Sequence, residues 1–422
     1  MGETAVDEKQ ILLKKYFGSE KFRPGQEKSI NAILSGRDVF AIMPTGSGKS
    51  LCYQLPALMV SGLTLVVSPL ISLMKDQVEA LNAKGIPAAY INSSMSYYDM
   101  RSIREGVKNR LYRLLYVSPE RLSDKDFISL AAVADISVVA VDEAHCISQW
   151  GPGFRPAYLK IAQFISTLPR RPVVGAFTAT ATKRVKKDII RLLELDSPKM
   201  VSTGYDRPNL YFSVIKCENK YHKLAGLVER LSGESGIIYC QTRNTVESVY
   251  NRLISDGYSV CKYHAGMSES DRRKSQNDFT RGKARIMAAT CAFGMGINKP
   301  DISFIIHMSM PKDMESYYQE VGRAGRDGRR AVCILLYSPR DAELAHWMIE
   351  NSDTAKELSA RELKREKRLK LKRLSSMKAY CETCSCLRAH ILRYFGERPR
   401  RKCKGCSNCK PDREIWGKPD EK

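Results

Sequence analysis

The sequence predicts an α/β fold made of two parallel-sheet lobes, followed by a small helical region rich in cysteine. Short apolar runs of strand length alternate with longer segments of helical character, which is typical of parallel sheets covered on both faces. The runs are too numerous for one compact sheet, and beyond residue 339 they give way to basic residues and clustered cysteines. The runs lie at 39–42, 64–68, 114–118, 138–142, 173–177, 236–240, 285–289, 303–308 and 331–337.

The first run leads directly into a glycine-rich segment, MPTGSGKS, at residues 43–50. Glycines after a buried strand let backbone N–H groups curl around a phosphate at a helix N-terminus. Met43 stands where the strict phosphate-loop pattern has glycine, so a chance match in a loop is the alternative. We expect Lys49 to reach the β- and γ-phosphates of a nucleoside triphosphate and Ser50 to bind Mg²⁺. The rest of the expected loop is Thr45, Gly46, Ser47 and Gly48.

A second apolar run, at 138–142, ends in the sequence VDEAH at residues 141–145. An acidic pair at the end of a buried strand is typical of nucleotide hydrolysis, in which one carboxylate binds the metal ion and the other orients water. We assign Asp142 to the metal and Glu143 to the attacking water. Combined with the glycine-rich segment, this pair predicts a site for nucleoside triphosphate hydrolysis.

The segment TGYDRPN, at residues 203–209, is rich in turn-forming residues and falls between two groups of apolar runs. We place the linker between the two lobes there. The expected domains are therefore residues 1–205, 206–340 and 341–422.

Two arginines lie between the last two runs of the second group. Arg323 and Arg326, in GRAGRDG, are expected at the start of a helix, on one face. Guanidinium groups supplied by a second lobe can stabilise charge on a transferring phosphoryl group, and the flanking glycines permit close approach to phosphate. The alternative is surface ion pairing with Glu315 or Glu320.

Charge indicates a polyanionic partner. The chain has 69 lysines and arginines against 46 acidic residues, a net charge of +23, and residues 361–373 hold eight basic residues in an expected helix. Nucleic acid is the first candidate and an acidic membrane surface the second, while a solvated helix face without a ligand is the alternative for the basic run. Because the chain lacks a membrane-length apolar stretch and a secretion signal, we expect a soluble, cytoplasmic protein.

The thirteen cysteines fall into two classes. Seven are scattered, mostly in apolar runs, and are expected to be reduced thiols, whereas six lie between residues 381 and 409. A disulfide framework is out of place in an intracellular protein, so the cluster indicates metal binding. Spacing alone favours one zinc set, namely Cys381, Cys384, Cys403 and Cys406.

Taken in order, these motifs resemble those of the RecQ-family DNA helicases of the second helicase superfamily, from about residue 12 to residue 409. The family has two RecA-like lobes with ATP bound between them. FRPGQ, at residues 22–26, is similar to its leading motif, which implies that Gln26, with Arg23, binds adenine and selects ATP. Ser19 stands where the family usually has an aromatic residue that stacks on the base.

Further matches lie at 68–77, 118–122, 177–182, 238–243 and 292–300, and the resemblance implies that they line the strand-binding groove or couple it to ATP. SQWGPGFRP, at residues 148–156, resembles the aromatic-rich loop of the family, although Pro152 and Gly153 replace the usual His-Asp. Aromatic rings in this loop could stack on bases or plug the lobe interface. The residues implied to contact nucleic acid are Trp150, Phe154, Arg155, Thr178, Thr180 and Arg243.

The resemblance also selects a different set of zinc ligands from the one that spacing favours. The family carries one cysteine before a helix that ends in Tyr-Phe-Gly-Glu, and three more afterwards. This pattern implies a structural zinc ion held by Cys386, Cys403, Cys406 and Cys409. Cys381 and Cys384 are then spare or substitute ligands.

The function implied is that of an ATP-dependent DNA helicase that moves 3′ to 5′ on single-stranded DNA and unwinds duplex or junction DNA in repair and recombination. Its cofactors are ATP, Mg²⁺ and Zn²⁺, and it is expected to act as a monomer with unknown protein partners. Many relatives continue into a winged-helix domain, whereas this sequence stops soon after Cys409. An ATP-gated DNA-binding or remodelling module with poor strand separation is therefore one alternative, and an RNA-directed motor is another. The catalytic residues are Lys49, Asp142, Glu143, Arg323 and Arg326.

Overall fold

The computed structural model describes residues 2–92, 95, 97–150, 154–294, 299–351 and 359–410. The chain divides into two compact units, Met1–Gly204 and Tyr205–Lys422, so the division falls inside the turn-rich segment 203–209. Pro152 and Gly153 of the aromatic-rich loop lie outside the described residues, as do residues 295–298 of the last family motif.

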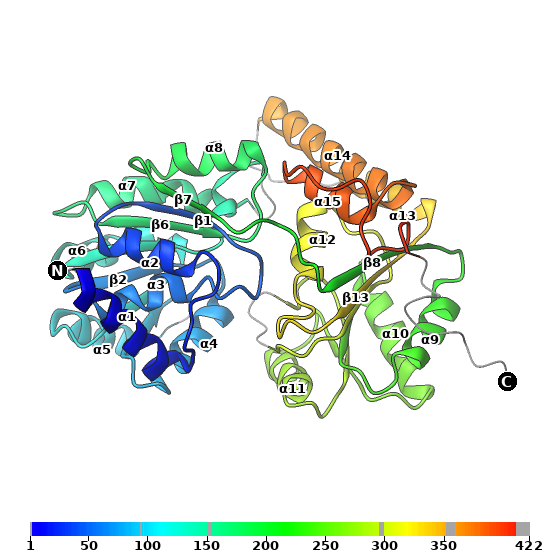
Figure 1. Ribbon diagram of the computed structural model, residues 1–422, viewed down its shortest axis with the longest axis horizontal. Coiled ribbons are helices and arrows are strands. Elements are labelled where there is room, and N and C mark those ends of the chain that lie inside the picture. The colour runs from blue at the N-terminus through cyan, green and yellow to red at the C-terminus, as the bar shows by residue number, and fades with distance from the viewer. Residues whose placement is uncertain are drawn as a thin grey trace. The chain divides into compact units, whose positions relative to one another are not determined.

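Unit 1 is a seven-stranded parallel sheet with helices on both faces (Figure 1). Its strand order is β3-β4-β2-β5-β6-β1-β7. The strands are β1 (Val39–Ile42), β2 (Leu63–Val67), β3 (Ala88–Ile91), β4 (Leu114–Val117), β5 (Ile136–Val141), β6 (Val173–Thr178) and β7 (Lys199–Ser202). The helices are α1 (Gly2–Phe17), α2 (Gln26–Leu34), α3 (Leu51–Gln54), α4 (Ile71–Asn82), α5 (Tyr97–Lys108), α6 (Lys125–Val133), α7 (Ile161–Ser166) and α8 (Lys183–Leu192).

Burial explains why the central strands of unit 1 are continuous apolar runs. Every residue of β1, β2 and β4 is buried, because helices cover both faces of the sheet. Side chains of β1 and β2 that point to one face pack with residues of α2, α3 and α4 in a single apolar cluster. This core fixes the carboxyl ends of the strands, where the predicted nucleotide motifs begin.

Unit 2 contains a six-stranded parallel sheet in the order β10-β11-β9-β12-β13-β8 (Figure 1). The strands are β8 (Leu210–Lys216), β9 (Gly236–Tyr239), β10 (Val260–Tyr263), β11 (Ile286–Ala289), β12 (Phe304–His307) and β13 (Ala331–Tyr337). The helices are α9 (Lys220–Arg230), α10 (Arg243–Ser255), α11 (Glu269–Thr280), α12 (Met314–Val321), α13 (Pro339–Glu350), α14 (Ala360–Glu382) and α15 (Leu387–Tyr394). The predicted fold of two parallel-sheet lobes and a helical region is confirmed, and the basic run at 361–373 lies within α14.

The nine apolar runs all form strands, while four strands were not anticipated. These four are β3, β7, β8 and β10, and they are the two edges of each sheet. An edge strand has one neighbour and is less completely enclosed, so its sequence needs no unbroken apolar run. In β7, for example, three of the four residues are exposed.

The cysteine-containing end of the chain covers one of these edges. A parallel bridge pairs Phe212 of β8 with Cys406, and the Phe212 N–H donates to the carbonyl oxygen of Gly405 at 3.1 Å. In Figure 1 this terminal segment runs beside β8. The cysteine region is thereby joined to the sheet of unit 2 by backbone hydrogen bonds. Among the described residues, no helix has the length and apolar character needed to span a membrane.

Candidate nucleotide, nucleic-acid and metal sites

The predicted nucleotide motifs of unit 1 converge on the carboxyl edge of its sheet. The glycine-rich segment follows β1, the acidic pair follows β5, and Thr178 ends β6, which lies between those two strands. Ligands of open parallel sheets characteristically bind at this edge. The sheet order therefore brings together groups that lie far apart in the sequence.

Within the glycine-rich loop, the ammonium group of Lys49 donates to the carbonyl oxygens of Met43 at 3.1 Å and Pro44 at 3.4 Å. Ser47 closes the same turn, because its hydroxyl donates to the Pro44 carbonyl oxygen at 2.6 Å. Ser50 directly precedes α3. A compact turn that carries Lys49 and Ser50 at the start of a helix suits recognition of a phosphate and its metal ion.

Gln26 and Arg23 lie against this loop. The Gln26 amide donates to the carbonyl oxygens of Ser47 at 3.1 Å and Gly48 at 3.0 Å, and its oxygen accepts from the backbone N–H of Arg23 at 2.8 Å. The guanidinium group of Arg23 donates to the carbonyl oxygen of Gly46 at 2.6 Å. Both residues thus contact the glycine-rich loop. Adenine recognition by Gln26 stays a prediction.

The acidic pair follows the buried strand β5. Burial raises the pKa of Asp142 to about 7; the adjacent Glu143 carboxylate adds to this rise, and Lys49 opposes it. A bound cation would favour the ionised form of such a carboxylate, which suits a metal ligand. Glu143 has a φ of 46°, in the left-handed region that non-glycine residues seldom occupy, and such conformations cluster at functional sites.

A histidine connects the acidic pair to the Thr-Ala-Thr motif. The Nδ1 atom of His145 lies 2.8 Å from the hydroxyl of Thr178 and 3.3 Å from the carboxylate of Glu143. The hydroxyl of Thr178 also donates to the carbonyl oxygen of Thr180 and accepts from its N–H. All three motif side chains, His145, Thr178 and Thr180, are buried. They form a fixed link between the Glu143 carboxylate and the end of β6.

The described part of the aromatic-rich loop packs against α8. Arg184 lies over the ring of Trp150, with its Cζ 3.0 Å from the ring centroid, and the hydroxyl of Ser148 donates to Asp188 at 2.6 Å. Trp150 and Phe154 are both half-buried. Arg155 lies 3.7 Å from Glu120 of the 118–122 motif. One described flank of the loop is therefore tied to α8, and the other lies near the 118–122 motif.

In unit 2, Arg243 begins α10 and its guanidinium group lies beside Gly266. His264 contacts Glu247 at 2.8 Å through Nε2 and accepts from the Gly266 N–H at 3.2 Å through Nδ1. These contacts hold the turn at 264–266 against Arg243. An arginine beside a fixed backbone turn is suited to a phosphate contact.

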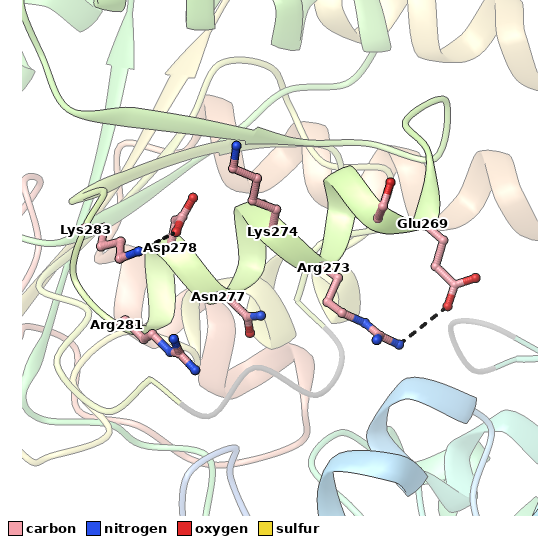
Figure 2. A pocket seen from close by; sticks show the side chains of 8 residues that line it. Glu269, Arg273, Lys274, Asn277, Asp278, Arg281 and Lys283 are labelled. Atoms are coloured by element: carbon pink, nitrogen blue, oxygen red, sulfur yellow. Dashed lines mark ion pairs between the residues drawn. The ribbon is translucent and has the colours of Figure 1, made fainter.

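A polar hollow in the surface of unit 2 follows α11, as Figure 2 shows. Its charged side chains form two ion pairs, Arg273 with Glu269 at 3.9 Å and Lys283 with Asp278 at 3.7 Å. None of the residues that line it was predicted to bind nucleotide, metal or DNA. We assign no function to this hollow.

The expected position of Arg323 and Arg326 at the start of a helix is wrong. Helix α12 ends at Val321, and both arginines lie in the turn that follows. Gly325 has a φ of 57°, and a Cβ at this position would stand 2.5 Å from the side chain of Asn209, so the chain cannot continue as a regular helix. Arg323 is buried against the backbone of Gly294, which excludes the alternative of surface ion pairing for it.

The two arginines also form a concentrated positive site. Burial lowers the pKa of Arg326 to about 10, and the charge of Arg323 contributes to that fall. Glu320, which the alternative reading paired with these arginines, contacts His307 at 2.9 Å. A buried arginine beside a half-buried one is a suitable environment for an anion.

Four cysteines converge at the end of unit 2. The Sγ atoms of Cys386, Cys403, Cys406 and Cys409 all lie within 4.8 Å of one another, and those of Cys386 and Cys406 are 3.9 Å apart. A tetrahedron with Zn–S bonds of about 2.3 Å has S···S edges of about 3.8 Å, so this group fits zinc. Backbone N–H groups of Ala389 and Gly405 donate to the sulfurs of Cys386 and Cys403, each at 3.4 Å. Cys381 and Cys384 are outside this group.

Four further residues were not identified from the sequence. His145 belongs to the VDEAH segment at residues 141–145, so it could have been named as a candidate site residue. In contrast, nothing in the sequence distinguishes Arg184, Arg207 and Arg388 from the other basic residues of a chain with 69 of them. The partners of these three arginines are distant in sequence; Arg388, for example, contacts Arg207, which lies 181 positions earlier. Only the folded chain shows these contacts.

Comparison with known proteins agrees with this arrangement. Residues 23–189 match the family described as DEAD/DEAH box helicase, residues 219–328 match the helicase conserved C-terminal domain, and residues 339–410 match RecQ zinc-binding. The ATP-dependent DNA helicase RecQ of Bacillus subtilis is 46% identical over 401 residues, which cover 95% of this chain and 66% of that protein. The RecQ protein of Pasteurella multocida is 42% identical, with 96% of this chain and 62% of that protein covered.

Other similarities are more distant. A putative ATP-dependent RNA helicase, R290, of Acanthamoeba polyphaga mimivirus is 39% identical, with 94% of this chain and 71% of that protein covered. The structure of Saccharomyces cerevisiae Dbp5 bound to RNA and ADP BeF3 aligns with a TM-score of 0.66 and 19% identity, covering 86% of this chain and 99% of Dbp5. The similarity to Dbp5 supports the fold alone. The chain spans about two thirds of the length of the bacterial RecQ proteins that it matches.

Proposed function

Because this chain belongs to the RecQ family of helicases, we propose that it hydrolyses ATP in response to DNA, moves 3′ to 5′ along one strand, and separates duplex or junction DNA in repair and recombination. DNA as substrate would place the protein inside the cell. One observation carries the proposal: the glycine-rich loop, the acidic pair and Thr178 follow three adjacent strands, and His145 bridges the last two. A link of this kind is what a motor needs to couple hydrolysis to strand contact.

In the proposed site, Lys49 binds the β- and γ-phosphates of ATP, with the loop Thr45–Ser50 around them. Ser50 and Asp142 hold Mg²⁺, which neutralises developing charge on the phosphate oxygens when bound. Glu143 orients the attacking water, and Arg323 and Arg326 stabilise the charge of the transferring phosphoryl group. Gln26, with Arg23, selects adenine.

On the nucleic-acid side, we assign the strand contacts to Trp150, Phe154, Arg155, Thr178, Thr180 and Arg243. Stacking on aromatic rings tolerates any base, which suits movement along arbitrary sequence. The four-cysteine group holds a structural zinc ion, since its sulfurs leave no position for a reacting ligand. Its role is to fix the end of unit 2.

The proposal is tested by strand displacement on duplexes with a 3′ tail, a 5′ tail or no tail, with and without ATP. We expect displacement of the 3′-tailed DNA only with ATP, and none by Glu143→Gln at equal concentration. Displacement of the 5′-tailed duplex in preference would contradict the assigned polarity.

Two alternatives are separated by the same assay. The mimivirus relative is named as an RNA helicase, so matched RNA duplexes form one arm. ATP hydrolysis with DNA but without displacement would favour an ATP-gated DNA-remodelling module. Preference for the RNA duplex would favour an RNA-directed motor.

A further inference from the structure

The turn that carries Arg323 and Arg326 is held from outside its own helix. Its carbonyl groups, freed where α12 ends, accept hydrogen bonds from the guanidinium group of Arg207. The distances are 3.4 Å to Gly322, 3.0 Å to Ala324 and 2.9 Å to Gly325. Asn209 adds donors to the carbonyl oxygens of Gly325 at 2.9 Å and Arg329 at 2.8 Å. Two residues of the segment after Gly204 therefore fix the shape of the arginine turn.

The chemistry of Arg207 suits this task. A planar guanidinium group donates several hydrogen bonds from one rigid fork, whereas a lysine ammonium group acts as a point donor. Burial lowers the pKa of Arg207, yet an arginine side chain stays protonated at neutral pH. Arg207 is therefore a permanent donor to three carbonyl oxygens of one turn.

Arg207 is itself held by the cysteine region. The buried guanidinium group of Arg388 donates to the carbonyl oxygen of Arg207 at 2.7 Å, to the carboxylate of Asp206 at 2.5 Å, and to the carbonyl oxygen of Leu210. Arg388 follows Cys386 by two positions, and it packs against Gly405, which lies between Cys403 and Cys406. The cysteine group thus has one intermediate residue between it and Arg207.

A second contact clamps the same segment. The Tyr205 N–H donates to the carboxylate of Glu397 at 2.7 Å, and the ring of Tyr205 stacks on Phe395 with centroids 4.5 Å apart. Tyr318 of α12 donates its hydroxyl to the carbonyl oxygen of Tyr205 at 2.7 Å. The segment after Gly204 is consequently fixed both to the residues that follow α15 and to the helix that precedes the arginine turn.

We propose that Arg207 is a positioning residue for Arg323 and Arg326, and that Arg388 of the cysteine region locks it in place. The inference rests on the proposed function, since it assigns Arg207 to the geometry of the phosphoryl-transfer site. Arg207 touches neither nucleotide nor DNA in this proposal. It acts through the turn, so its loss displaces the two guanidinium groups without removing them.

The test compares Arg207→Ala with the wild-type protein in DNA-stimulated ATP hydrolysis. Because a misplacement of about 1 Å can cost about 100-fold in rate, we expect kcat to fall by about 10- to 100-fold. The KM for ATP should stay within about twofold, because ground-state binding is left intact. Binding of ADP with aluminium fluoride, a mimic of the transferring phosphoryl group, should weaken by at least about 10-fold while binding of ADP alone is unchanged.

Two further variants make the test specific. Arg329→Ala changes an arginine close to the same turn whose side chain is 86% exposed, and wild-type kinetics are expected. Adding Arg207→Ala to Arg326→Ala should lower kcat by less than the product of the two single losses, since part of the effect of Arg207 passes through Arg326. If Arg207→Ala does not fold, Arg207→Lys is used, with the same direction of change expected.

The outcomes separate this inference from the proposed function. A wild-type protein that hydrolyses no ATP with DNA would overturn the proposed function. If the wild type is active and Arg326→Ala is impaired, a wild-type kcat in Arg207→Ala would overturn the positioning role alone. Fully additive losses in the double variant would do the same, as would equal losses of ADP and ADP–aluminium fluoride binding.

Discussion

The Nδ1 atom of His145 lies 2.8 Å from the hydroxyl oxygen of Thr178, and this contact joins the strand end that carries Glu143 to the neighbouring strand β6. His145 also lies 3.3 Å from the Glu143 carboxylate. If bound DNA displaced the Thr-Ala-Thr segment, the movement would therefore be passed by the single side chain of His145 to Glu143, the carboxylate proposed to orient the attacking water. This path is short, its His145 and Thr178 side chains are buried, and each member can be removed singly.

Thr178→Val removes the hydroxyl and keeps the shape of the side chain. We expect the stimulation of ATP hydrolysis by single-stranded DNA to fall by about 10-fold, in line with the loss of about 1–3 kcal/mol when a buried polar partner is left unsatisfied. Basal hydrolysis should change by less than about twofold. Thr280→Val, at the exposed last residue of α11 and outside every assigned motif, is the matched control and should behave as wild type. Equal stimulation of Thr178→Val and wild type would refute the coupling path.

Trp150→Ala tests the aromatic-rich loop. A base stacked on an aromatic ring contributes about 1–3 kcal/mol, so the variant should lose most of its DNA stimulation while basal ATP hydrolysis remains. Arg184→Ala should give a weaker effect of the same sign, because Arg184 supports the Trp150 ring from α8. Lys187, exposed on the same helix, supplies the control through Lys187→Ala. The sensor role fails if Trp150→Ala is stimulated as strongly as wild type.

Asp142→Asn should stabilise the protein in a pH-dependent manner. Burial raises the pKa of Asp142 from 3.8 to about 7, so the unfolded chain releases this proton at lower pH than the folded chain. The stability of the wild type therefore falls between about pH 4 and pH 7 on account of this group, and the deficit is complete above pH 7. The asparagine variant has no such deficit.

Thermal unfolding without Mg²⁺ or nucleotide measures this effect. The melting temperature of Asp142→Asn should exceed that of wild type by about 2–4 °C at pH 8, for a difference on the order of 1 kcal/mol in a half-buried group. The difference should shrink as the pH is lowered to 5, and ATP hydrolysis should be lost at every pH. A difference in melting temperature that is independent of pH would contradict the assignment.

Cys406→Ser tests the metal site, since Cys406 is the fully buried member of the four-sulfur group. We expect less than one zinc per chain by metal analysis and a lower melting temperature, because structural zinc contributes directly to folding. Cys384→Ser is the matched control, as Cys384 is exposed and lies outside the group. Full zinc in Cys406→Ser would contradict the site, whereas zinc loss from Cys384→Ser would favour the set that spacing alone selects.

The central strands and the nucleotide motifs could be predicted because their physical requirements are local. A strand buried on both faces must be continuously apolar, and a phosphate loop needs glycine and lysine at fixed spacing. The edge strands β3, β7, β8 and β10 carry no such requirement and were missed. Spacing alone favours a zinc set that includes Cys381 and Cys384, whereas the sulfurs that converge in the folded chain are those of Cys386, Cys403, Cys406 and Cys409.

The contacts that hold the arginine turn could not be predicted for a different reason. Arg207 and Gly325 are 118 positions apart, and nothing in their neighbouring residues indicates a hydrogen bond between them. The helix expected at Arg323 is wrong for the same reason. The carbonyl groups of this turn accept hydrogen bonds from Arg207 and Asn209, which are distant in sequence. Gln26 likewise was recognised as part of a motif, whereas its contact with Gly48 appears only in the folded chain.

The most direct test of the account is the rate of ATP hydrolysis by the purified chain with and without single-stranded DNA. We expect DNA to raise the rate by at least about 10-fold, and Lys49→Ala and Glu143→Gln each to abolish both rates, as expected when a catalytic group contributes several kcal/mol. An intact protein with a full complement of zinc that hydrolyses no ATP in the presence of single-stranded DNA would contradict it.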